Sequence, residues 1–148
     1  MKHRSNCLLF SRIILILALQ VCCVASTQAQ PPKMIGKWNV KFTLANANEY
    51  SLRFDAQPDG KGSLLLVDPR LWDGAKPSEA KWSQGDGDSV TFSGNVEFAL
   101  GNVGRDAGIL IFRGKLGTDA SMTGEAEFSP LAGEGPSKHG TFKAVREE

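Results

Sequence analysis

The segment MIGKWNVKF, residues 34–42, decides how the rest of the chain is read. In this segment Trp38, Val40 and Phe42 alternate with polar residues, which is the period of two that a strand with one buried face requires. Gly36 stands two places before the tryptophan. The segment therefore predicts a β-strand whose apolar side chains enter a core, and it leaves open whether the Gly-x-Trp is a structural device or part of a binding site.

The same alternation recurs along the following residues, and turns rich in glycine or proline separate the segments. Antiparallel strands joined by short connections protect their edges by closing into a barrel or by splitting into two packed sheets. The sequence therefore predicts an all-β, eight-stranded antiparallel up-and-down barrel, with a two-sheet β-sandwich as the alternative. The expected strands are Ile35–Leu44, Glu49–Ala56, Ser63–Asp68, Glu79–Gln84, Ser89–Leu100, Ala107–Leu116, Ser121–Phe128 and Gly140–Arg146.

Phenylalanines mark the expected core. Each falls on the apolar face of its segment, and burying one such side chain contributes about 1.5–3 kcal/mol. Their volume competes directly with any ligand cavity, so a filled interior is favoured over a hollow one. The seven phenylalanines after the leader are Phe42, Phe54, Phe92, Phe98, Phe112, Phe128 and Phe142.

The first 29 residues have the layout of a secretory signal peptide. Lys2, Arg4 and Arg12 form a basic start, the apolar run 13–25 follows, and small residues come next. The run is shorter than the about 20 residues that a membrane span needs. We therefore expect residues 1–29 to be a signal peptide that is removed on export.

Residues 30–148 are expected to form one domain that is secreted or periplasmic. The chain's three cysteines all lie in the leader, so this domain has no disulfide. Val21 precedes Cys22 where a lipoprotein signal has a small residue, so lipid anchoring is not expected. Basic and acidic residues are nearly balanced and interspersed, which is typical of a solvated surface. We expect no nucleic-acid partner and no transmembrane span in the mature chain.

The Gly-x-Trp of residues 36–38, on the first strand of such a meander, resembles the calycin group of lipocalins, avidin-like proteins and small bacterial barrel inhibitors. In lipocalins the tryptophan closes one barrel end and packs against an arginine late in the last strand. The resemblance implies that Gly36, Trp38 and Arg146 form this closure, since Arg146 has the inward parity of its segment. Residues 118–120, Thr-Asp-Ala, match a lipocalin turn motif except for its tyrosine.

Catalytic and metal-binding patterns are sparse. The only histidine after the leader is His139, whereas a zinc site takes three or four ligands. Glu125 and Glu127 share the outer face of their segment, so we expect ordinary pKa values and no acid–base role. Neither a Gly-x-Ser-x-Gly motif nor a phosphate-binding loop is present. We therefore expect no enzymatic activity, no catalytic residue, no metal and no cofactor.

With no catalytic or metal-binding pattern present, we expect a binding function. We expect the mouth of any pocket to be lined by Tyr50, Trp72 and Trp82, at the barrel end opposite Trp38 and near residues 101–106. Alternatively, Trp72 plugs that end. The first hypothesis is a non-enzymatic module that binds a small apolar or amphipathic ligand. The alternatives are a protein-interaction module, such as an inhibitor of an exported enzyme, and a structural domain of the cell envelope.

Overall fold

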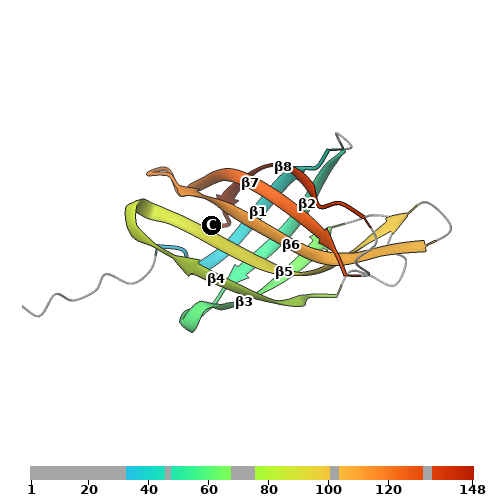
Figure 1. The fold of residues 1–148 in the computed structure, drawn as a ribbon. Helices are drawn as coiled ribbons and strands as arrows, with labels where there is room; N and C mark the ends of the chain where they lie inside the picture. Colours follow the sequence, from blue (N-terminus) through green and yellow to red (C-terminus); the bar gives the residue numbers. More distant parts are fainter. Residues whose placement is uncertain (1–32, 46–47, 68–75, 101–103, 132–134) are drawn as a thin grey trace, which may run out of the picture. The chain divides into compact units, whose positions relative to one another are not determined.

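The computed structural model describes residues 33–45, 48–67, 76–100, 104–131 and 135–148. They form a closed barrel of eight antiparallel strands, in which each strand pairs with its neighbours in sequence and β8 pairs with β1 (Figure 1). The expected barrel is confirmed and the sandwich alternative is wrong. The strands are β1 Gly36–Thr43, β2 Glu49–Ala56, β3 Lys61–Val67, β4 Ser78–Gln84, β5 Ser89–Leu100, β6 Gly104–Leu116, β7 Ser121–Pro130 and β8 Lys138–Arg146.

The expected strand ends were wrong where pairing continues past the apolar pattern. β6 begins at Gly104 rather than Ala107, because it pairs with β5 as far as Leu100. β8 begins at Lys138 because that residue still pairs with Phe128. Hydrogen bonding to a neighbouring strand, rather than side-chain alternation, therefore sets these ends.

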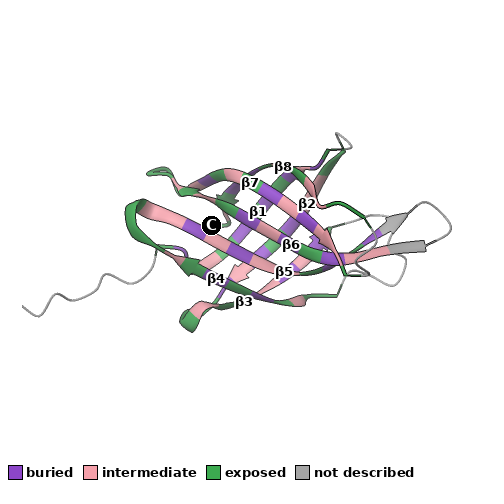
Figure 2. Cartoon of the chain, viewed as in Figure 1, coloured by how far each residue is buried: buried purple, intermediate pink, exposed green. Residues whose placement is uncertain are grey.

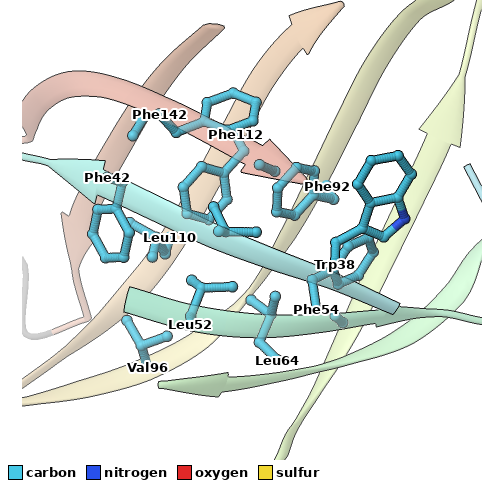
Figure 3. Close-up of a cluster of buried hydrophobic side chains, with 14 of the residues drawn as sticks. Trp38, Phe42, Leu52, Phe54, Leu64, Phe92, Val96, Leu110, Phe112 and Phe142 are labelled. Carbon is cyan, nitrogen blue, oxygen red and sulfur yellow. The ribbon is translucent and has the colours of Figure 1, made fainter. Parts of the chain in front are cut away.

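Alternate residues of each strand point into the barrel, and purple and green bands accordingly alternate along the ribbon (Figure 2). All seven expected core phenylalanines are buried. The rings of Phe54 and Phe92 stack with centroids 4.5 Å apart, and those of Phe92 and Phe112 stack at the same distance. Further ring contacts lead from Phe112 to Phe42 and on toward Tyr50, so aromatic side chains fill the described interior (Figure 3).

Glycines at inward positions leave room for these rings. A Cβ atom on Gly114 would lie 2.9 Å from Cζ of Phe142, and one on Gly62 would lie 3.0 Å from Cε2 of Phe54. Carbon atoms at those distances overlap, so a larger residue would displace the ring. The aromatic filling and the glycines are therefore parts of one packing solution.

The two ends of the barrel differ, and we name them by their connections. At the turn end, hydrogen-bonded tight turns at 57–60, 85–88 and 117–120 join β2 to β3, β4 to β5 and β6 to β7. Gly60 has a positive φ of 73°, which a glycine adopts readily in a tight turn. The other end, where β1–β2, β3–β4, β5–β6 and β7–β8 connect, is the loop end.

Replacing Phe92 by alanine should lower the free energy of unfolding by about 3–5 kcal/mol, because the ring stacks on both sides and the barrel wall cannot collapse into the space. Chemical denaturation of the protein purified after export measures this loss. Thr123→Ala, on the exposed face of β7, serves as the control and should change the free energy by about 0.5 kcal/mol or less. A loss below about 1 kcal/mol for Phe92→Ala would mean that the ring stack does not hold the core together.

Candidate functional site

Arg146 closes the turn end. Its guanidinium Cζ lies 4.7 Å from the centroid of the Trp38 ring, and the two residues are partners in the β1–β8 register. The Nη1 group donates a hydrogen bond of 2.7 Å to the carbonyl oxygen of Ile35, and Nη2 donates to the carbonyl oxygen of Lys33. The predicted stacking is therefore present, and the same side chain also ties down the segment that precedes β1.

Gly36 is required by this closure. Its φ is +134°, a backbone conformation that residues with a side chain rarely adopt. A Cβ atom there would also lie 3.0 Å from Nη1 of Arg146. The Gly-x-Trp pattern is thus explained by geometry, since the glycine makes space for the arginine that covers the tryptophan.

Met34 is the part of the closure that the sequence did not reveal. Its side chain is fully buried, and its carbonyl oxygen accepts a 2.8 Å hydrogen bond from Nε1 of Trp38. Its own N–H donates to Oε1 of Gln84 at 3.2 Å, and Lys33 forms an ion pair with Asp88. Trp38 and Gln84 therefore hold Met34 across the turn end, and only the apolar pair Met34-Ile35 before Gly36 hinted at this role.

Trp82 does not lie where the sequence analysis placed it. Its Nε1 group donates to the carbonyl oxygens of Gln57 and Lys61, at 2.8 Å and 2.7 Å, and these residues flank the first tight turn. Because β4 runs from the loop end to the turn end, its late residues lie beside the closure. The prediction that Trp82 and Tyr50 share one mouth is wrong.

Tyr50 lies at the loop end, as expected. Its ring stacks on Phe42 with centroids 5.2 Å apart and meets the edge of Phe98 at 4.9 Å. Phe98 in turn contacts Phe128 at 5.0 Å. Tyr50 is partly exposed, so this cluster brings aromatic surface to solvent. Trp72, the third residue predicted at this mouth, lies outside the described residues, as do residues 101–103.

Core residues at both ends keep a little exposure. Leu66, Val96 and Phe98 at the loop end retain 6–7%, while at the turn end Met34 and Trp38 retain 1% or less and Trp82 retains 9%. A polar pair borders the loop-end cluster. The Lys138 ammonium lies 2.9 Å from Oδ2 of Asp106 and 5.3 Å from the centroid of the Phe128 ring.

Two carboxylates have shifted pKa values. The hydrogen bond from Ser121 lowers the pKa of Asp119, and the hydrogen bond from the Arg113 guanidinium lowers the pKa of Glu127. The expectation that Glu127 has an ordinary pKa is therefore wrong, because Arg113 on the neighbouring strand binds it at 2.8 Å. Both shifts favour the ionised form, which is opposite to the raised pKa of a general acid.

Within the described ranges, no three histidine, cysteine, aspartate or glutamate side chains gather as a metal site would need. The same residues contain no helix of the length and hydropathy that crossing a membrane takes.

No protein-family model and no curated protein matches the chain. The resemblance to lipocalins therefore still rests on Gly36, Trp38 and Arg146.

Removing the guanidinium should destabilise the barrel without affecting binding at the other end. We expect Arg146→Ala to lower the free energy of unfolding by about 2–4 kcal/mol, because two charge-assisted hydrogen bonds and the ring contact disappear together. Arg146→Lys should lose about half as much, since an ammonium cannot reach both carbonyls in the same planar geometry. Lys143→Ala, on the exposed face of the same strand, is the matched control. Unchanged stability in Arg146→Ala would contradict the closure.

The pKa of Glu127 should rise toward its ordinary value in Arg113→Ala, which an NMR titration of the side-chain carboxyl would detect. Because the folded-state pKa lies below the unfolded one, the bond to Arg113 stabilises the fold above the unfolded-state pKa. That contribution disappears as the pH falls through the folded-state pKa. A Glu127 titration that is identical in both proteins would show that Arg113 is not the cause.

Proposed function

We propose that this domain is a non-enzymatic binding module that takes up a small apolar or amphipathic molecule at the loop end. The observation that carries the proposal is the difference between the two ends. Met34, Trp38 and Arg146 close the turn end, whereas at the loop end the aromatic cluster reaches solvent through Tyr50. Export through a signal peptide at residues 1–29 is part of the same proposal.

The chemistry of the loop end favours a flat ligand with one polar group. The Tyr50 ring is partly exposed beside Phe42 and Phe98, and aromatic pairs gain about 0.5–1.5 kcal/mol beyond the burial of area. The ion pair of Lys138 and Asp106 at the border of the cluster suits a polar group that stays hydrated. Since the described interior is filled, the ligand contacts the end of the core rather than a central cavity.

A second candidate function is a protein-interaction module. Its support is an apolar stripe on the outer face of β6, formed by Ala107, Ile109 and Ile111, with Leu131 beside it. Ile109 is 37% exposed and Leu131 58% exposed. Stable interfaces cover about 800 Å² on each partner, so a stripe of four side chains suits a transient partner.

An uncharged fluorescent probe, N-phenyl-1-naphthylamine, tests the ligand proposal. The protein purified after export should bind it, and Tyr50→Ala should weaken the affinity about fivefold, which corresponds to about 1 kcal/mol. Trp82→Phe is the control, because Trp82 lies at the turn end, and it should leave the affinity unchanged. If Tyr50→Ala binds as tightly as the wild type, the site is elsewhere. If the wild type binds no probe, the protein-interaction candidate takes precedence.

A further inference from the structure

The hairpin formed by the late part of β5 and the early part of β6 extends beyond its neighbours. We call residues 95–100 and 104–107 the arm. β5 and β6 stay paired along it, but β4 stops pairing with β5 at Gly94 and β7 stops pairing with β6 at Gly108. Figure 1 shows the two strands, yellow and orange, projecting past the rest of the barrel. Among the described residues the arm is therefore a two-stranded ribbon, a structure that is only marginally stable alone.

Two hydrogen bonds join the base of the arm to the described part of the wall, and Glu97 on the arm has an interaction of its own. Near its base, the hydroxyl of Ser78 donates to the carbonyl oxygen of Asn95 at 2.6 Å, and the N–H of Leu131 donates to the carbonyl oxygen of Ala107 at 2.9 Å. Bending the arm outward would therefore break these two bonds but leave the pairing of β4 with β5 and of β6 with β7 intact.

The inner face of the arm inserts a ring into the loop end. The Phe98 ring lies 4.9 Å from Tyr50, 5.0 Å from Phe128 and 6.4 Å from Phe42, measured between centroids. These three rings come from strands β2, β7 and β1, outside the arm. We call the space among them the three-ring pocket, and in this structure Phe98 occupies it.

Both arm strands have a glycine where the lateral pairing ends. A Cβ atom on Gly94 would lie 2.7 Å from Cδ1 of Leu64, and one on Gly108 would run into the Phe128 ring. Packing alone therefore demands glycine at both positions. Glycine also permits the largest change in backbone dihedrals, which is the property that a hinge needs.

An ion pair fastens the arm to β8. Asp106 is on the arm, Lys138 is on β8, and their charged groups lie 2.9 Å apart with side chains 21% and 42% exposed. We call this pair the latch. Pairs with such exposure contribute little and break readily.

We propose that the Phe98 ring occupies a site that the ring system of a ligand can take instead. The arm bends outward at its two glycines, the latch breaks, and a flat apolar group of aromatic size enters the three-ring pocket. This inference rests on the proposed function and names its site and its mechanism of access. Once the latch is broken, the Lys138 ammonium has lost its carboxylate partner, so a ligand with an anionic group beside its ring system replaces Asp106. The ligand class is therefore an aromatic acid or another flat apolar anion.

Two probes that differ by a single sulfonate separate the pocket from the ammonium. They are N-phenyl-1-naphthylamine and 8-anilinonaphthalene-1-sulfonate. The wild type should bind the sulfonated probe more tightly. Asp106→Asn should raise the affinity for both probes two- to fivefold, because it removes the latch and keeps the ammonium. Lys138→Met should raise the affinity for the uncharged probe by the same factor and abolish the preference for the sulfonate.

Arg113→Met is the matched control for these variants. It removes an ion pair of similar length from the outer wall, between Arg113 and Glu127, away from the arm. It should leave both affinities unchanged. Equal effects of Arg113→Met and Asp106→Asn, or no effect of either latch variant, would overturn the latch.

A disulfide tests the movement itself. In Ala107→Cys/Leu131→Cys, oxidation should join the base of the arm to the end of β7 and weaken probe binding at least tenfold, and reduction should restore it. Ser121→Cys/Val145→Cys is the control, because these residues pair at the turn end. Phe98→Ala should bind the uncharged probe about tenfold more tightly than the wild type, since its pocket is vacant.

The outcomes distinguish the two proposals. If the wild type binds probe through Tyr50 but the oxidised arm variant binds as well as the reduced one, the moving arm is wrong and the proposed function stands. If neither the wild type nor Phe98→Ala binds either probe, while circular dichroism shows both folded, the proposed function is wrong as well. Should the arm disulfide not form, the latch variants with their control decide the question.

Discussion

The chain of ring contacts through the barrel is the constraint on which the other features depend. Stacked and edge-to-face rings run from Phe54 through Phe92 and Phe112 toward Tyr50 at the loop end. Closing eight strands leaves an interior that side chains can just fill, and here aromatic rings fill it. The rings take up the interior volume that a ligand cavity would need. A binding site is therefore expected at the ends of this row of rings.

Different groups cover the last aromatic rings at the two ends of the barrel. At the turn end a guanidinium lies over Trp38 and holds two carbonyl groups of the preceding segment, which brings Met34 across the opening. At the loop end the last rings are covered by Phe98 of the arm, a ribbon whose described lateral pairing ends at Gly94 and Gly108. The proposal of a ligand that displaces this cover rests on that difference between the ends.

Side-chain alternation was sufficient to predict the strands and the inward phenylalanines, and the need to protect strand edges led to the barrel, with the sandwich as the alternative. The pairing of Trp38 with Arg146 came from the resemblance to lipocalins, with which the inward parity of Arg146 agrees. Trp82 was misplaced because its aromatic character, rather than the direction of β4, guided the prediction; following the strand direction leads to the turn end. Met34 and the arm were not predictable in this way, because they depend on where lateral pairing stops and on contacts between residues far apart in sequence.

The central claim is that a ligand replaces Phe98 at the loop end while the turn end stays closed. Intermolecular nuclear Overhauser effects between bound N-phenyl-1-naphthylamine and the aromatic protons of the protein test it most directly. We expect contacts from the probe to Tyr50, Phe42 and Phe128, together with loss of the contact between Phe98 and Tyr50. Contacts from the probe to Trp38 or Met34, with Phe98 still against Tyr50, would contradict it.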